Sequence, residues 1–125
     1  MEQKICLDTD ICIEIIKKNP AYDFIFDKFS ASDVFISSVT LFELFLRELH
    51  LDDIERFVGY FMVLSFDESC AIKGSEIARN LRKEGKTIDF RDIFIAAACL
   101  VNNCSLLTLN KKHFERIKGL ELIDI

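Results

Sequence analysis

The sequence is poor in residues that interrupt regular structure, with one Pro and four Gly among 125 residues. It contains no low-complexity segment, internal repeat or linker. Half of the residues are hydrophobic and 30% are charged, as is typical of a single folded domain. We therefore expect one domain over residues 1–125, large enough to bury a core without disulfides or a structural metal.

A long apolar stretch is also missing. The longest run, Ile93–Val101, is too short to span a bilayer, and the first residues lack the apolar segment of a signal peptide. The five cysteines are odd in number, form no C-x-x-C pair and lie among apolar residues. We expect reduced core cysteines in a cytoplasmic protein that has no membrane anchor.

An excess of positive charge is absent as well. Sixteen basic residues stand against 21 acidic ones, giving a net charge of -5, which argues against nucleic-acid binding through a broad basic surface. A local basic strip remains possible on this composition. Its candidates either flank an RNA path or form a solvated surface, and they are Arg79, Arg82, Lys83, Lys86, Arg91, Lys111 and Lys112.

Short β-like runs alternate with segments of helical period from end to end, which indicates an α/β fold. Strands separated by helices are mostly parallel, because a parallel neighbour requires a crossover connection. We expect helices on both faces of the sheet and ligands at the carboxyl ends of the strands. The five expected strands are Lys4–Leu7, Val34–Ser37, Met62–Phe66, Ser105–Leu109 and Glu121–Ile125.

Two expected helices carry more apolar side chains than a small domain can bury. One bears an aromatic stripe over Tyr22–Phe29, and the other, Thr40–Leu49, has little polar surface. We expect part of this surface to form an interface with a second copy or with a partner protein.

Acidic residues recur at the junctions between elements. Asp8 ends the first strand, Glu43 falls in the first turn of the helix from Thr40, and Asp92 falls in the first turn of an alanine-rich helix. Each has a structural explanation taken alone, since Thr40 to Glu43 matches a T-x-x-E capping box and acids favour helix N-termini.

Taken together, a parallel sheet can gather these acids, with Asp10 and Asp89, on one edge. Neighbouring carboxylates repel one another unless a cation or shared protons neutralise them. Oxygen ligands without a His or Cys cluster indicate Mg²⁺ or Mn²⁺ rather than zinc. The chemistry that such a site predicts is hydrolysis of a phosphodiester bond.

Four stretches in order resemble the PIN-domain ribonuclease toxins of the VapC type. They are Leu7-Asp8-Thr9-Asp10, Ser38-Val39-Thr40-Leu41-Phe42-Glu43, Asp92-Ile93-Phe94-Ile95-Ala96-Ala97-Ala98 and the segment from Leu107 to Ile117, which contains T-L-N-K-K-H-F. The resemblance covers nearly the whole chain, and the last two stretches are its most specific parts.

This resemblance implies an α/β/α sandwich with a mostly parallel five-stranded sheet, a metal-dependent endoribonuclease activity, inhibition by a small antitoxin, and dimerisation. Carried over by position, Asp8 and Asp92 would hold Mg²⁺ or Mn²⁺, Glu43 would be the third acid and Asn110 would take the fourth place. Thr40 would orient the first turn of its helix. The substrate-binding residues expected on this basis are Thr40, Lys111 and Lys112.

Two departures from the family pattern keep other functions open. Asp10 stands where Asn or Ser is usual, and Asn110 stands at an often acidic position, where it supplies no charge. One alternative is a PIN-like binding module whose catalytic cluster has decayed. The other is an aspartyl-phosphate phosphatase with Asp8 as nucleophile and Asp10 as acid, although the chain has no room for a cap domain. His113 can touch a phosphate, but a histidine on a surface helix is more often solvated.

Overall fold

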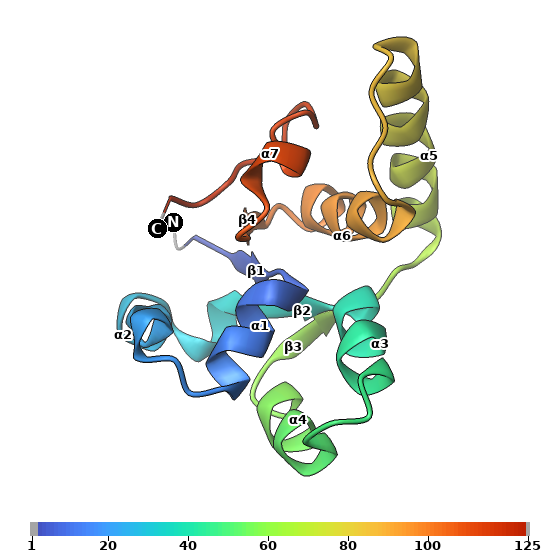
Figure 1. Ribbon diagram of the computed structural model, residues 1–125. Helices are drawn as coiled ribbons and strands as arrows, with labels where there is room; N and C mark the ends of the chain where they lie inside the picture. Colours follow the sequence, from blue (N-terminus) through green and yellow to red (C-terminus); the bar gives the residue numbers. More distant parts are fainter. Residues whose placement is uncertain (1–2, 125) are drawn as a thin grey trace.

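Four short parallel strands form the middle layer of the computed structural model, which describes residues 3–124 (Figure 1). They lie in the order β3-β2-β1-β4, and every pair of neighbours is parallel. The sheet confirms the expected α/β class. Its strands are β1 (Ile5–Leu7), β2 (Val34–Ser37), β3 (Met62–Leu64) and β4 (Ser105–Leu107).

The prediction of a fifth strand over Glu121–Ile125 is wrong. This segment meets β4 only through a parallel bridge between Leu106 and Leu122. Two hydrogen bonds hold it, from Leu106 N to Glu121 O at 2.9 Å and from Ile123 N to Leu106 O at 3.0 Å. The segment is too briefly paired to form a strand, and Ile125 lies outside the described residues.

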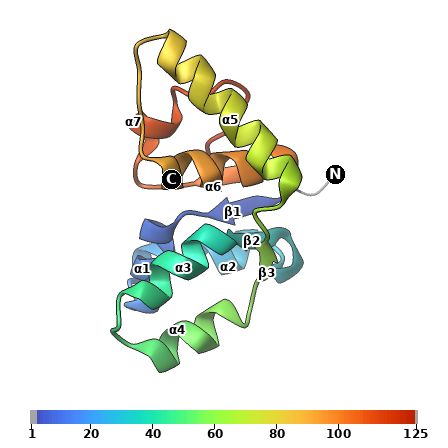
Figure 2. The same cartoon turned by 90° about the vertical axis from the view of Figure 1, so that its right-hand side faces the viewer.

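Side chains alternate between the two faces of the sheet, as strand geometry requires. Ile5 and Leu7 belong to one hydrophobic cluster, whereas Cys6 between them belongs to the other. Figures 1 and 2 show α1 to α4 on one side of the sheet and α5 to α7 on the other. The strands are thus buried between two helical layers, which explains why short apolar runs suffice to form them.

The helices on the first face are short. They are α1 (Thr9–Ile16), α2 (Phe24–Lys28), α3 (Ser38–Leu46) and α4 (Leu51–Val58). The single helix expected over Tyr22–Phe29 is divided, because a 3₁₀ turn at Pro20–Tyr22 precedes α2. A second 3₁₀ turn occupies Ala31–Asp33.

The helices on the second face are α5 (Glu68–Lys83), α6 (Phe90–Val101) and α7 (Lys111–Phe114). Close packing joins α5 to α6, because a Cβ atom added at Gly74 would lie 3.7 Å from the Ala97 Cβ atom. Ala96, Ala97 and Ala98 are buried, which confirms the close approach that the alanine run predicts. Gly85, with φ +71°, follows α5 in the left-handed conformation that glycine tolerates.

All five cysteines are buried and free, as expected for core residues. No helix within residues 3–124 is long and apolar enough to cross a membrane. The apolar surplus on α3 is also confirmed, since Phe42 and Leu46 are 59% and 60% exposed. Phe26 of the aromatic stripe is half exposed as well.

Candidate active site

Asp8 lies at the centre of the site, where β1 turns into α1. As the N-cap residue of α1, its Oδ1 atom accepts a hydrogen bond from the Thr9 amide at 2.8 Å. Its Oδ2 atom accepts a bond from the Thr108 hydroxyl at 2.6 Å. Burial, followed by repulsion from Asp10, raises the pKa of Asp8 from its ordinary value to about 7. Asp8 therefore holds a proton more tightly than an ordinary aspartate does.

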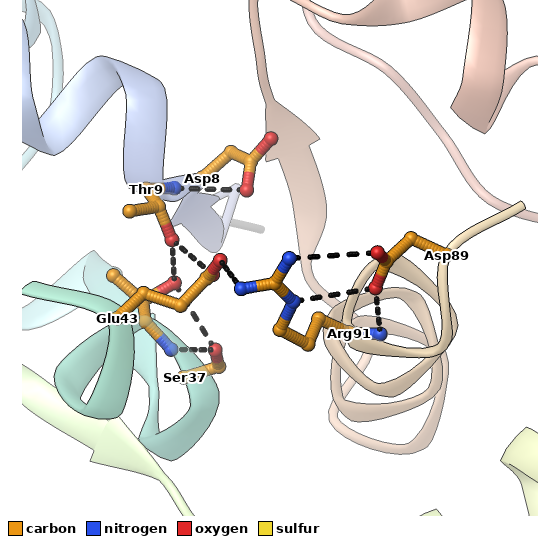
Figure 3. Close-up of polar contacts among 7 residues, drawn as sticks. Asp8, Thr9, Ser37, Glu43, Asp89 and Arg91 are labelled. Carbon is orange, nitrogen blue, oxygen red and sulfur yellow. Dashed lines mark hydrogen bonds and ion pairs between the residues drawn. The ribbon is translucent and has the colours of Figure 1, made fainter. Parts of the chain in front are cut away.

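Glu43 approaches Asp8 through Thr9 (Figure 3). The Thr9 hydroxyl donates to the Glu43 Oε1 atom at 2.7 Å and lies 3.0 Å from the Thr40 hydroxyl. One residue of α1 therefore connects the acid that ends β1 with the acid on α3.

The start of α3 differs from the expected capping box. Ser37 is the N-cap residue, and its hydroxyl accepts a hydrogen bond from the Thr40 amide at 3.0 Å. Since α3 begins at Ser38, Glu43 lies in its second turn, where it cannot cap the helix. Glu43 is freed to point toward Thr9, and its structural explanation as a capping residue is wrong.

Thr40 is fully buried, and its hydroxyl lies between those of Thr9 and Ser37. Thr40 lies in the first turn of α3, and its expected role in orienting that turn stays a prediction. Its burial disagrees with the expected direct contact to substrate, because solvent does not reach the side chain. Thr40 is a positioning residue for Thr9 and hence for Glu43.

Asp92 lies in the first turn of α6, as predicted, and Asp89 is the N-cap residue of that helix. Burial, followed by repulsion from Asp89, raises the pKa of Asp92. The Arg91 guanidinium spans the site in Figure 3, with Nη1 3.5 Å from Glu43 Oε2 and Nε 3.3 Å from Asp89 Oδ1. Arg91 thus partly offsets the negative charge at the rim.

Asn110 follows β4 and begins α7. Its backbone amide donates to the Thr108 hydroxyl at 3.0 Å, and its side-chain nitrogen lies 2.8 Å from the His113 Nδ1 atom. The same His113 atom is 3.7 Å from Asp92 Oδ2. Asn110 therefore connects to Asp8 through Thr108 and to Asp92 through His113, which agrees with its expected place beside these acids.

Asp10 is held by backbone groups on two elements. Its Oδ1 atom accepts from the Ile11 amide at 2.7 Å and its Oδ2 atom accepts from the Leu109 amide at 3.2 Å. A carboxylate that ties α1 to the end of β4 serves as a structural connector. The aspartyl-phosphate alternative needs Asp10 as a mobile general acid, and this geometry disfavours it.

Two of the expected basic residues lie close to Thr108, whose hydroxyl donates to Asp8. Lys111 and Lys112 line a hollow of about 410 Å³ with Thr108, Leu109 and Asn110. Lys111 also pairs with the exposed Asp124, with 2.9 Å between Nζ and Oδ1.

The acidic side chains of the described residues can supply two carboxylate ligands for a divalent cation but do not supply three. Within residues 3–124, no group of three or more His, Cys, Asp or Glu side chains lies close enough together to hold a metal ion. Asp8 and Asp92 nevertheless repel each other, and Asp92 contributes to the raised pKa of Asp8. Two mutually repelling carboxylates match the Mg²⁺ sites that use one or two protein carboxylates and leave the remaining positions to water and phosphate.

Sequence reasoning missed the hydroxyl groups that organise the acids. Thr9, Ser37 and Thr108 each bond to an acid or to the residue that positions it. The available signal was their place next to strand ends, in Asp8-Thr9, Ser37-Ser38 and Leu107-Thr108. The contact between Arg91 and Glu43 had no local signal, because the two residues are far apart in sequence.

Comparison with known proteins agrees with this architecture. Residues 5–120 match the PIN domain family model. The chain is 35% identical to "Ribonuclease VapC1" of Methanocaldococcus jannaschii, over 98% of this chain and 89% of that protein. It is 34% identical to "tRNA(fMet)-specific endonuclease VapC" of Shigella flexneri, over 97% of each chain.

Among solved structures, the fold is similar to that of a chain in the DNA-bound VapBC structure from Salmonella typhimurium. The match has a TM-score of 0.88 and 32% identity, and it covers 98% of each chain. VapBC2 from Rickettsia felis, bound to a DNA fragment from its promoter, matches with a TM-score of 0.84, 26% identity and coverage of 97% and 98%. The chain belongs to the PIN domain family and, within it, to the VapC group.

Proposed function

We propose that this protein is an endoribonuclease that hydrolyses RNA phosphodiester bonds and acts as the toxin of a toxin–antitoxin pair. The observation that carries the proposal is the mutual repulsion of Asp8, which follows β1, and Asp92, in the first turn of α6, with Glu43 bound to Thr9 beside Asp8. The carboxyl end of β1 lies at the edge at which open α/β sheets bind ligands. The names of the VapC relatives support the same activity.

The proposed cofactor is Mg²⁺ or Mn²⁺, held by Asp8 and Asp92. When bound, such a cation polarises the scissile phosphate and makes an attacking water a stronger nucleophile. Glu43, whose Oε1 atom accepts a hydrogen bond from Thr9 and whose Oε2 atom faces Arg91, would be the general base for the attacking water. Asn110 can orient the water by its side-chain amide without adding charge.

The substrate side of the proposal rests on Lys111 and Lys112. Both side chains line the hollow next to Thr108, whose hydroxyl bonds to Asp8. A lysine beside the acids can hold an RNA phosphate at the cleavage site, since phosphate contacts supply most of the affinity for nucleic acid. Thr40 takes no part in this contact because it is buried.

The proposed partners are a small antitoxin and a second copy of the chain. VapBC structures with a similar fold support the first. The exposed side chains of α3 give either partner an apolar surface to cover. The free cysteines support a reducing compartment such as the cytoplasm.

The deciding experiment is an RNA cleavage assay with purified protein. We expect cleavage with Mn²⁺ or Mg²⁺, loss of cleavage in EDTA, and loss with the Asp8→Asn variant. RNase activity that survives EDTA, or that Asp8→Asn leaves unchanged, would overturn the mechanism. RNA that stays intact under all conditions would favour the alternative of a binding module without catalysis.

A further inference from the structure

Phe90, the first residue of α6, is an exposed aromatic side chain that is adjacent in sequence to two residues of the candidate active site. It is 69% exposed, although it lies between the helix cap Asp89 and Arg91, which reaches Glu43. Asp92 follows two residues later, a rise of about 3 Å along the helix axis. The backbone of Phe90 therefore lies within one helical turn of Asp92, while its side chain points to another side of the helix, since residues two apart do not face each other.

The ring of Phe90 is held in place by other aromatic rings. It stacks on Phe94, one helical turn further along, with ring centroids 6.4 Å apart and planes inclined by 17°. Phe94 packs in turn against Phe66, with 4.7 Å between centroids. This arrangement leaves one face of Phe90 toward solvent on a fixed support, and a fixed exposed ring loses little entropy when another ring stacks on it.

A hollow with apolar walls and basic edges adjoins the same ring. It measures about 230 Å³, and its lining includes Leu81, Arg82, Lys86, Ile88, Phe90 and Ile93. Lys86 pairs with Glu84 at 3.4 Å, but both side chains are exposed and such pairs contribute little. A phosphate can therefore replace Glu84 at low free-energy cost.

An aromatic platform with cations beside it is the combination by which proteins hold single-stranded nucleic acid. We propose that Phe90 stacks on an unpaired base of the bound RNA, while Arg82 and Lys86 contact the phosphates next to that base. The base bound at this subsite is unpaired, because a paired base cannot present its face to Phe90. The inference rests on the proposed nuclease function and assigns that nuclease a base-binding subsite.

The test uses the full chain and a single-stranded RNA of about 12 nucleotides, uridines with one central 2-aminopurine, whose fluorescence falls on stacking. Binding is measured in EDTA, so that the RNA remains uncut. We expect Phe90→Ala to weaken binding about 5- to 150-fold, the range of ~1–3 kcal/mol for one stacked base. We also expect it to abolish the fluorescence quenching.

Two further variants separate stacking from packing. Phe90→Tyr should retain affinity and quenching, whereas Phe90→Leu, which keeps apolar volume without an aromatic face, should lose the quenching. Tyr60→Ala is the matched control, since Tyr60 is 74% exposed but lies at the turn before β3. Arg82→Gln and Lys86→Gln should each lower the slope of log affinity against log salt by about 0.7.

Several outcomes overturn the inference. One is that Phe90→Ala binds the RNA as tightly as the wild type, and another is that Phe90→Leu quenches the 2-aminopurine fluorescence as much as the wild type does. A third is that Phe90→Ala weakens the binding of a duplex of the same length by the same factor. The last is that the wild-type chain does not bind the RNA in EDTA. A change in self-association by light scattering with unchanged RNA binding would assign the surface to a protein contact instead. Cleavage by the wild-type chain with Mn²⁺ is measured separately, so the nuclease function can stand when the base-binding subsite fails.

Discussion

Arg91 and Glu43 connect the two helical layers across the rim of the acidic site, with 3.5 Å between Nη1 and Oε2. Arg91 belongs to α6 on one face of the sheet, and Glu43 belongs to α3 on the other. The guanidinium also reaches Asp89, so one cation faces two carboxylates (Figure 3). A divalent ion that enters the site approaches an acid that already has a positive neighbour.

Removing this neighbour should favour cation binding. We expect Arg91→Gln to tighten Mn²⁺ binding several-fold, because one positive charge near the acids is lost. The free energy of unfolding should change little, since Arg91 is half exposed and solvent screens its ion pairs. Titration followed by electron paramagnetic resonance measures the free Mn²⁺. Arg79→Gln on α5 is the control, and equal affinities in wild type and Arg91→Gln would contradict the prediction.

The raised pKa of Asp8 makes stability depend on pH. Its folded value of about 7 exceeds the ordinary 3.8, so its contribution is complete below the ordinary value and is lost as the pH rises through about 7. Without metal, the stability of the wild type relative to Asp8→Asn should therefore fall between about pH 4 and about pH 7. Urea unfolding in EDTA measures both proteins, with Asp27→Asn as an exposed control. A constant difference between wild type and Asp8→Asn would refute the buried, proton-retaining carboxyl.

Substitutions of Thr108 test how its hydroxyl sets the pKa of the Asp8 carboxyl. Its hydrogen bond lowers the pKa of Asp8, opposing the effect of burial. We expect Thr108→Val to raise that pKa further, so that the pH at which Mn²⁺ binding is half maximal moves upward. Cleavage at neutral pH should fall with it. Thr108→Ser keeps the hydroxyl and should behave like the wild type. If the Val and Ser variants showed the same dependence of Mn²⁺ binding on pH, Thr108 would not be a residue that tunes Asp8.

Substitutions of Asn110 test whether an uncharged side chain is sufficient for catalysis at the position that is often acidic in the family. Asn110→Asp adds a charged oxygen ligand beside Asp8 and Asp92, so we expect tighter Mn²⁺ binding with cleavage retained or raised. Asn110→Ala should slow cleavage less than Asp8→Asn does. Calorimetry and single-turnover cleavage measure the two quantities. Wild-type metal affinity and rate in both Asn110 variants would place this residue outside the site.

Phe45 tests the apolar surface on α3. Its side chain is 37% exposed and lies among other exposed apolar residues, so we expect it to contact a second copy or the antitoxin. Phe45→Glu should reduce self-association or antitoxin binding at least tenfold, because an interface leaves the new charge without a partner. Light scattering and pull-down with the antitoxin measure these effects. A monomeric wild type whose antitoxin binding tolerates Phe45→Glu would contradict the prediction.

The sequence predicts the places of the acids better than their surroundings. Asp8 and Asp92 lie where strand and helix periodicity put them, because each sits at an element boundary marked by local pattern. The sequence predicts the N-cap of α3 three residues too late, at Thr40, since Ser37 and Thr40 are both acceptable near a helix start and only the tertiary contact with Thr9 distinguishes them.

The fifth strand and the contacts at the rim of the site also depend on tertiary structure, which a local sequence pattern does not reveal. Leu122 and Ile123 have strand-like side chains, but strand formation depends on how much of β4 remains available for pairing. Arg91 has several acids within its sequence neighbourhood, and its contact with Glu43 follows from the spacing between helical layers. Distances between layers are set by packing, and no local pattern encodes them.

Asp8 is both the N-cap of α1 and the central acid of the site. Its replacement would therefore affect both the stability of the fold and the proposed catalysis. Selection for the folded chain alone would keep a capping residue here, because replacing such a cap by Ala costs about 1 kcal/mol. A descendant that had stopped cutting RNA would therefore still tend to carry Asp or Asn at this position. Asp92 has no such protection, since Asp89 caps its helix. Drift at Asp92 would be the earlier genetic sign that a lineage has abandoned catalysis.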